Sequence, residues 1–304
     1  MATTNTPEII PDLCTGCSRC VRVCPAGVLA MAEGLAFVCG PGCIRCGHCL
    51  AVCPAQAVVV EEIRATMDFA TFQENDTWLR WGDFSIVDLV RLMRSRRSCR
   101  NYTGESVPRL WLEDLIKIGT TAPSGSNSQK WTFTVLMTRK EVEALGTGIA
   151  LFFKRLNRLA ANRFARTYSR LFAGDVLGHY FRHHYETVRQ GLIAWETEGR
   201  DILFHGAPSA IIIGSEPGGS CPKEDALMVA QNILLAAHAM GLGTCMIGYA
   251  VAALNRDSGL KKLIAIPGSE TIQAVIVLGY PDEEYCRLAG RKVIKPRFPA
   301  IARH

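Results

Sequence analysis

Two cysteine runs near the start of the chain have the residue types and the spacing of a metal-cluster site. Residues 14–25 read CTGCSRCVRVCP and residues 43–54 read CIRCGHCLAVCP, so both have the form C-x-x-C-x-x-C-x-x-x-C-P. In such runs three successive thiolates hold one iron–sulfur cluster, and the fourth cysteine, before the proline, binds the other cluster of a pair. The repeat therefore predicts two [4Fe–4S] clusters in one small domain.

This crossing rule divides eight cysteines into two ligand sets. The predicted first set is Cys14, Cys17, Cys20 and Cys53, and the predicted second set is Cys43, Cys46, Cys49 and Cys24. Zinc is the alternative, but zinc sites use pairs of C-x-x-C and not triplets with a fourth cysteine before proline. The segment 7–62 resembles the two-cluster bacterial ferredoxins. Cys39 lies off the pattern, and we interpret it as a spare packed thiol.

A domain that only carries electrons transforms no substrate, so we expect the rest of the chain to use them. The first candidate there is the stretch 95–108, SRRSCRNYTGESVP, in which three arginines crowd around Ser98. Guanidinium groups and a hydroxyl match the oxygens of a phosphate. Cations also suit the last turn of a solvated helix, so charge alone leaves both interpretations open.

The second candidate is the turn 122–131, APSGSNSQKW. It is rich in small residues that form hydrogen bonds, and a turn of this kind can present backbone N–H groups and side-chain amides to a flat polar ring. Taken by itself, the stretch is only a loop.

Four motifs in order resemble the nitroreductase family of flavin enzymes. They are R-R-S-C-R at 96–100, A-P-S-G-S-N-S-Q-K-W at 122–131, G-L-G-T-C-M-I-G at 241–248, and L-G-Y-P at 278–281 with Arg291 and Lys292 following. The resemblance covers about residues 85–300. It implies an α+β fold with a nitroreductase-like mixed sheet flanked by helices, and FMN bound at the interface of a homodimer.

The resemblance also implies the residues that hold FMN. Its phosphate would be bound by Arg96, Arg97, Ser98, Arg100, Arg291 and Lys292. The flavin ring would be lined by Pro123, Ser124, Gly125 and Asn127 of the partner subunit, and by Ile247 and Gly248, with a backbone N–H near N5. Lys130 stands where the family commonly has proline, which leaves the local turn and the charge near the substrate open. A flavin carries the redox chemistry itself, so no Ser-His-Asp set or acid pair is required, and the catalytic side chains stay unassigned.

The elements that must position these residues follow from periodicity and capping patterns. Ser85, with Asp88 three residues later, has the pattern of a capping box and predicts a helix over 85–96. A second helix is expected over 108–121. Strands are expected over 132–137 and 209–214.

Residues 226–255 are apolar and contain no Asp, Glu, Lys or Arg. A membrane-spanning helix needs about 20 continuous apolar residues, and Gly241-Leu242-Gly243 interrupts this segment. We therefore expect a buried helix followed by a buried strand. The whole chain divides into a ferredoxin-like domain (1–62), a linker (63–84) and an FMN-binding domain (85–304).

The region 140–200 is helical in pattern and rich in arginine and aromatic residues. It could form amphipathic helices that pack a dimer, or a lid over the flavin that selects an anionic or aromatic substrate. His179 and His183 share a helix face but lack a third ligand at useful spacing, so we expect no zinc. Cys245 is interpreted as a small buried hydrophobic residue.

The formal charge of the 304-residue chain is +6 and is unevenly distributed. The first 64 residues carry four Lys/Arg against five Asp/Glu, so they contribute −1 and the remainder +7. Because the basic residues are not part of a recognisable nucleic-acid motif, we expect an anionic cofactor and no nucleic acid. The start, MATTNTPEIIPDLC, has no basic and apolar signal pattern, so we expect a cytoplasmic protein with no membrane partner.

These observations predict a flavin oxidoreductase. An external low-potential donor, either ferredoxin-like or NAD(P)H, would supply electrons, and the two clusters would relay them to FMN. The flavin would reduce an electron-poor organic acceptor, nitroaromatic- or quinone-like. The alternative is an electron-transfer flavo-iron–sulfur protein that docks a partner enzyme and has no small-molecule substrate. A redox sensor that binds nucleic acid through its basic body is a third interpretation.

Overall fold

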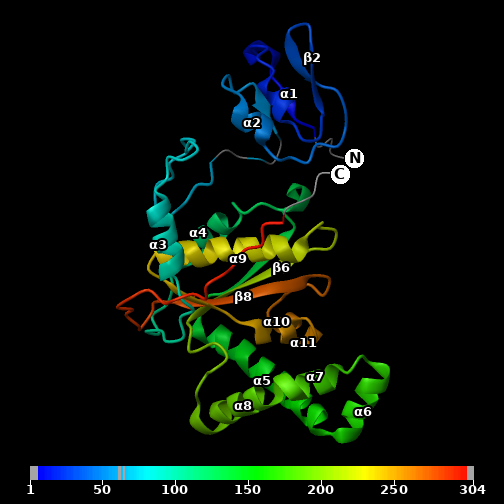
Figure 1. The fold of residues 1–304 in the computed structure, drawn as a ribbon, viewed down its shortest axis with the longest axis vertical. Coiled ribbons are helices and arrows are strands. Elements are labelled where there is room, and N and C mark those ends of the chain that lie inside the picture. Colours follow the sequence, from blue (N-terminus) through cyan, green and yellow to red (C-terminus); the bar gives the residue numbers. More distant parts are fainter. Residues whose placement is uncertain (1–5, 61–62, 64–65, 300–304) are drawn as a thin grey trace.

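A computed structural model describes residues 6–60, 63 and 66–299 of the chain. Figure 1 shows a small N-terminal unit at one end of the long axis and a larger body below it. The helices that follow the first strand of the body form the opposite end.

The N-terminal unit consists of two interlocked halves. Its elements are β1 (Glu8–Ile9), η1 (Pro11–Leu13), α1 (Arg19–Val23), β2 (Leu29–Ala32), β3 (Leu35–Val38), α2 (His48–Val52) and β4 (Val58–Val59). Strand β1 pairs antiparallel with β4, and β2 with β3. Because β1 and β4 come from different halves of the repeat, neither half forms this unit alone.

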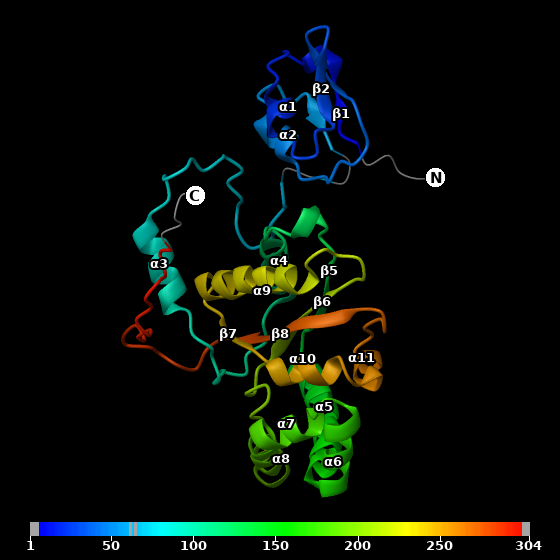
Figure 2. The ribbon, with the colours of Figure 1, turned by 45° about the vertical axis from the view of Figure 1, so that its right-hand side comes forward.

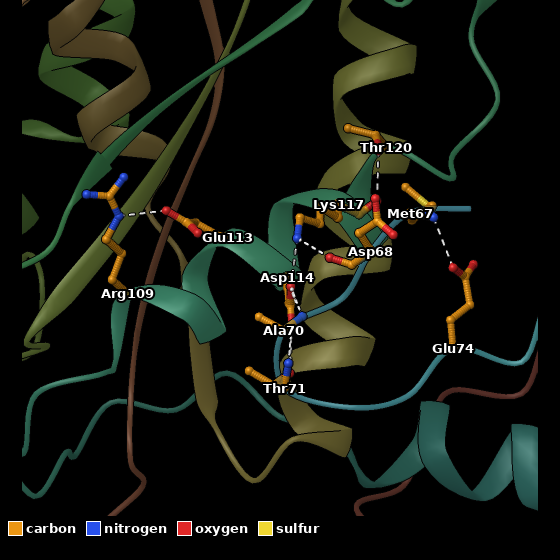
Figure 3. Close-up of polar contacts among 10 residues, drawn as sticks. All are labelled: Met67, Asp68, Ala70, Thr71, Glu74, Arg109, Glu113, Asp114, Lys117 and Thr120. Atoms are coloured by element: carbon orange, nitrogen blue, oxygen red, sulfur yellow. Dashed lines mark hydrogen bonds and ion pairs between the residues drawn. The ribbon is translucent and has the colours of Figure 1, made fainter. Parts of the chain in front are cut away.

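The segment between β4 and α3 (Ile86–Ser95) contains no helix or strand among its described residues. It is nevertheless fixed to the body through Asp114 of α4 (Arg109–Gly119), whose side chain is fully buried. The Asp114 carboxylate accepts hydrogen bonds from the backbone N–H groups of Ala70 and Thr71 and from the Thr71 hydroxyl, at 2.7–3.1 Å (Figure 3). The domain limits stay a prediction, and residue 62 lies outside the described residues.

Replacing Asp114 should release the segment between β4 and α3 from the body. Burial raises the pKa of Asp114, but hydrogen bonds from Thr71, Ala70 and Lys117 outweigh burial and lower it below its usual value. A carboxyl whose folded pKa is lowered stabilises the fold above its unfolded pKa of about 4, and this contribution is lost as the pH falls through the folded pKa. We expect Asp114→Asn to cost about 2–4 kcal/mol of unfolding free energy at pH 7, measured by urea denaturation.

The matched control is Glu113→Gln on the same helix. Glu113 forms an exposed ion pair with Arg109 at 2.6 Å (Figure 3), and such pairs contribute about 0–1 kcal/mol. The difference between the two variants should shrink as the pH falls below about 4 and through the lowered folded pKa of Asp114, because protonation then removes the carboxylate in the wild type. Equal losses at pH 7 would contradict the role given to Asp114.

The body is built on a four-stranded sheet with the order β5-β6-β8-β7. The strands are β5 (Trp131–Leu136), β6 (Ser209–Ser215), β7 (Gly243–Met246) and β8 (Thr271–Gly279). All named strand pairs are antiparallel. A parallel pairing, as expected of a mixed sheet, occurs in an isolated bridge between Ser98 and Thr244 at the β7 edge. The predicted strands over 132–137 and 209–214 correspond to β5 and β6 within one residue at each end.

Helices cover both faces of this sheet (Figures 1 and 2). Neighbouring residues of a strand point to opposite faces. Ile211 of β6 therefore packs with α4 and α9 (Pro222–Ala239), and Ile212 packs with α5 (Arg139–Ala161) and α10 (Gly248–Leu254). The predicted helix and strand within 226–255 are α9 and β7, and α10 (Gly248–Leu254) follows them. Among the described residues, no helix combines the length and apolarity that crossing a membrane requires.

The remaining helices lie on the α10 side of the sheet (Figure 1). They are α5 (Arg139–Ala161), α6 (Arg163–Phe172), α7 (Val176–His183), α8 (Tyr185–Glu198) and α11 (Ser258–Leu263). The predicted helices over 85–96 and 108–121 are α3 and α4. The Ser85 side chain caps α3 by accepting from the N–H of Asp88. A complete capping box, with bonds in both directions, is formed by Thr138 and Glu141 at the start of α5.

Candidate active site

The N-terminal unit contains two small cavities, each lined by four cysteines. One is lined by Cys14, Cys17, Cys20 and Cys53. The other is lined by Cys24, Cys43, Cys46 and Cys49. The fold thus brings together each predicted ligand set, including the fourth cysteine from the opposite half.

The loops around the two cavities have the same backbone shape. Gly16 and Ser18 in the first loop, and Arg45 and Gly47 in the second, have left-handed conformations with φ of 52–71°. Backbone of this kind turns successive N–H groups toward one centre and suits an anionic group. The Arg45 N–H donates to Cys43 Sγ at 3.3 Å. A side chain at Gly16 would lie 2.2 Å from the Gly34 carbonyl, so only glycine fits there.

The thiols of each set also influence one another. Burial raises the pKa of Cys20, and the neighbouring thiols Cys14 and Cys53 raise it further. The same holds for Cys49 and the thiols of its own set. In the part of the chain that the structure describes, no three His, Cys, Asp or Glu side chains are placed to hold a single metal ion. Each set places four thiols around one cavity, the number of thiolate ligands that a [4Fe–4S] cluster takes, so the two sets fit a cluster.

A cationic group forms where α3 ends. Arg96 closes that helix, and burial followed by the nearby Arg97 and Arg291 lowers its pKa. Arg291 comes from the C-terminal segment, so the fold brings together two predicted phosphate-binding stretches that are far apart in sequence. Among the described residues, neither these three side chains nor Arg100 pairs with a carboxylate. Such unpaired guanidinium groups fit a phosphate. Lys292 is exposed in the same segment.

A cavity of about 800 Å³ opens on the α10 side of the sheet. Arg100, Ile247 and Gly248 line it, which are three of the predicted flavin contacts. Other walls come from α5 and α7, the helices of the arginine- and aromatic-rich region. Clefts of roughly 300–1,000 Å³ hold small molecules in proteins, so this cavity is large enough for a flavin and an acceptor.

The end of strand β7 beside this cavity is held by a backbone hydrogen bond. The Ile247 N–H donates to the Val275 carbonyl at 2.9 Å, so a backbone N–H offered to a flavin there has to come from a neighbouring residue. Cys245 is buried, and burial raises the pKa of its thiol although Arg100 and Ser98 act in the opposite direction. This agrees with the interpretation of Cys245 as a small buried residue.

The far wall of the cavity is aromatic and was not predicted as a site. His179, Tyr180, His184 and Tyr249 line it, and the Tyr249 hydroxyl lies 3.5 Å from His184 Nδ1. His205 also lines the cavity, and burial and the nearby Arg100 lower its pKa. The helical spacing of His179 and His183 suggested a shared face, but the lining of the cavity includes His179 and not His183.

The turn 122–131 lies elsewhere, and none of its residues lines the large cavity. The Gly125 N–H donates to Asp225 Oδ1 at 2.9 Å, and Ser124 Oγ accepts from the Gln129 N–H at 3.1 Å. Pro123 is exposed. The unusual Lys130 donates to the Pro217 carbonyl at 2.9 Å. Within one chain, the predicted ring-lining turn is therefore separated from Ile247 and Gly248.

Asn127, predicted to line the flavin ring, faces the N-terminal unit. Its side-chain amide donates to the carbonyls of Arg45 at 2.7 Å and Ile44 at 3.3 Å. These residues lie between two cysteines of the second set. The turn thus connects the body with one of the two cysteine sites.

Two family models match the chain. Residues 93–280 match the nitroreductase family, and residues 6–54 match a 4Fe-4S dicluster domain. Together the two matches cover most of the cysteine repeat and most of the body.

The chain is also similar to curated proteins and to solved structures. The chain is 26% identical to a 4-nitrobenzoate reductase of Nocardioides over 64% of this chain and 81% of that protein. It is 25% identical to an iodotyrosine deiodinase of Thermotoga neapolitana over 69% of this chain and 92% of that protein. A nitroreductase with bound FMN from Bacteroides fragilis aligns with a TM-score of 0.49 and 20% identity, over 71% of this chain and 99% of that one.

Proposed function

Because this chain belongs to the nitroreductase family, we propose that it is an FMN-dependent oxidoreductase fed by two [4Fe–4S] clusters. The observation that carries the proposal is the large cavity, which joins Arg100 and the predicted flavin-side residues Ile247 and Gly248 to an aromatic wall. Bound clusters exchange single electrons, and bound FMN collects two of them for transfer to an organic acceptor. The chain's own residues bind, orient and shield these groups.

Each arginine and wall residue has a role in this proposal. Arg96, Arg97 and Arg291 hold the FMN phosphate, because they form a cationic group that no carboxylate of the described residues pairs with. Arg100 reaches from this group into the cavity. The aromatic wall excludes water from the acceptor and packs against its ring.

We also propose that the working unit is a homodimer. The turn 122–131 cannot reach the cavity of its own chain, so it serves the cavity of a second copy. Helix α3 supports this arrangement, because Ile86, Val87, Val90 and Met93 form an apolar face that is exposed in the single chain. Such a face is a site for protein contact.

The proposed acceptor is an electron-poor aromatic or quinone-like compound. Reduction of a nitro group to a nitroso group takes two electrons and two protons and releases water, and reduction of a quinone to a hydroquinone takes the same number of electrons and protons. The electrons come from an external low-potential donor, ferredoxin-like or NAD(P)H. The direction of flow follows from the acceptor being electron-poor.

The test uses anaerobically purified protein that has been chemically reduced and freed of excess reductant. With no second protein present, a nitroaromatic or a quinone should reoxidise it and yield one product per two electrons. The alternative function, electron transfer to a partner enzyme, predicts that these acceptors leave the reduced protein unchanged. No reaction with any small acceptor, in protein that contains iron and FMN, would favour the alternative.

The lining of the cavity further favours an anionic aromatic acceptor. Among its described lining residues it contains two arginines and three histidines and no carboxylate. One cationic lining residue, Arg256, is exposed and donates to the Ala252 carbonyl of its own helix region at 3.1 Å, so its side chain can reach an acceptor carboxylate. A related protein that is named 4-nitrobenzoate reductase supports this choice.

Substituting Arg256 tests the preference for anions. One charge-assisted hydrogen bond is worth about 1.5 kcal/mol, which corresponds to roughly tenfold in affinity. We therefore expect Arg256→Gln to raise KM for 4-nitrobenzoate about tenfold and to leave KM for uncharged nitrobenzene unchanged. Arg163→Gln, on α6 and outside the cavity lining, is the matched control. Equal effects on both compounds would contradict an anion contact.

A further inference from the structure

Asn127 makes the contact between the body and a cysteine loop of the N-terminal unit. Its Nδ2 donates to the carbonyl oxygens of Arg45 at 2.7 Å and Ile44 at 3.3 Å. Ile44 and Arg45 lie between Cys43 and Cys46 and line the cavity of the second cysteine set.

The turn that carries Asn127 is held rigidly in place. Ser126, Asn127 and Gln129 have φ of 46–52°, a left-handed conformation that is costly for residues other than glycine and persists only where the surroundings enforce it. Asp225 of α9 enforces it here, since its side chain is buried and accepts from the Gly125 N–H. A side chain at Gly125 would lie 2.6 Å from Ser220 Oγ. The Asn127 amide is therefore presented from a preformed support.

The hydrogen-bonding capacity of Asn127 decides between its two possible roles. An asparagine amide nitrogen carries two donor hydrogens, and two carbonyl oxygens of the N-terminal unit take them. In this arrangement its Nδ2 has no donor left for a flavin ring.

We propose that Asn127 is a docking residue that fixes the ligand loop of the second cysteine set to the body. The second cluster is then the one nearest the turn 122–131, and the first cluster lies farther from the body. This orientation rests on the proposed function for one step only, the assignment of that turn to the flavin of the second subunit. Electrons would then enter at the first set and leave at the second.

The test compares holoprotein carrying Asn127→Asp or Asn127→Ala with wild type. Aspartate turns a double donor into an acceptor that repels the two carbonyls, and alanine removes the contact if the aspartate variant does not fold. We expect backbone hydrogen exchange to rise at least fivefold in peptides covering 43–50 and to stay unchanged in those covering 14–22. We also expect reduction of FMN by an external donor to slow at least tenfold at unchanged iron and flavin content.

Ser126→Asp is the matched control, because Ser126 is an exposed neighbour in the same turn. Unchanged exchange over 43–50 in the Asn127 variants would overturn the docking role. Increased exchange with undiminished FMN reduction would overturn the assignment of the second set as the exit. Loss of FMN with unchanged exchange would show that Asn127 contacts the flavin ring instead of docking the N-terminal unit. The exchange result does not depend on flavin, so a protein that binds no FMN would refute the proposed function and leave the docking result standing.

Discussion

The double substitution Arg96→Ala and Arg100→Ala is expected to give a protein that keeps its iron and loses its FMN. Arg96 belongs to a cationic group with Arg97 and Arg291, and Arg100 extends into the large cavity. Each charge-assisted hydrogen bond to a phosphate is worth about 1.5–3 kcal/mol. Removal of two of them weakens FMN binding by at least about 100-fold. Anaerobic purification followed by iron and flavin counts measures the result.

The wild type should contain about eight iron atoms and one FMN per chain, because each [4Fe–4S] cluster holds four irons. Arg94→Ala is the matched control, since Arg94 is exposed on the last turn of the same helix and is absent from the cavity lining. The control should keep both iron and FMN. Full flavin occupancy in the double variant would show that the phosphate site lies elsewhere.

The grouping of the cysteines was predictable from the sequence, because both sets are encoded in two short runs. The structure places each set around one cavity, and the role of these residues as cluster ligands stays a prediction. The fold adds the crossing of Cys24 and Cys53, which the interlocked halves impose through the pairing of β1 with β4. The resemblance to the nitroreductase family rested on four motifs, and the match of residues 93–280 confirms it.

The aromatic wall of the large cavity was not predictable in the same way. The pattern of the region 140–200 fixed its helical character, but a helix period does not say what lies against each face. His184 gains its place through Tyr249, which is 65 residues away in the chain. For the same reason the sequence did not separate dimer packing from a lid. The cavity, which α5 and α7 help to line, supports the lid.

Asn127 shows a different limit of sequence analysis. Its motif marked it as a site residue, but a motif does not show which group an amide meets. Its partners are backbone carbonyls more than 80 positions earlier in the chain, and carbonyls are present at every residue. The supporting Asp225 was likewise invisible, because a buried carboxylate is recognisable only from the donors around it.

The strongest effect on the iron content is expected from two double substitutions. They test whether Cys24 is a ligand of the second cluster or of the first. If Cys24 belongs to the second set, Cys24→Ser combined with Cys46→Ser disrupts a single cluster and leaves about four iron atoms. Cys24→Ser combined with Cys17→Ser disrupts both clusters and leaves almost none. Non-additivity of this kind identifies residues that act in one unit. Iron counts and electron paramagnetic resonance of the reduced proteins distinguish the two outcomes.

Cys39→Ser is the control for these substitutions. Cys39 is exposed, so its interpretation as a packed thiol is wrong. It lies outside both cysteine-lined cavities and has its Sγ 3.5 Å from the Gly27 carbonyl, so this variant should retain about eight irons. FMN content reports the integrity of the body, because Ile247 belongs to a hydrophobic core separate from that of the N-terminal unit. If instead Cys24 with Cys17 leaves four irons and Cys24 with Cys46 leaves almost none, each half binds its own cluster. In that case the interlocked pairing of β1 and β4 serves the fold alone, and the position of Asn127 beside Cys43 and Cys46 no longer marks a site shared by both halves.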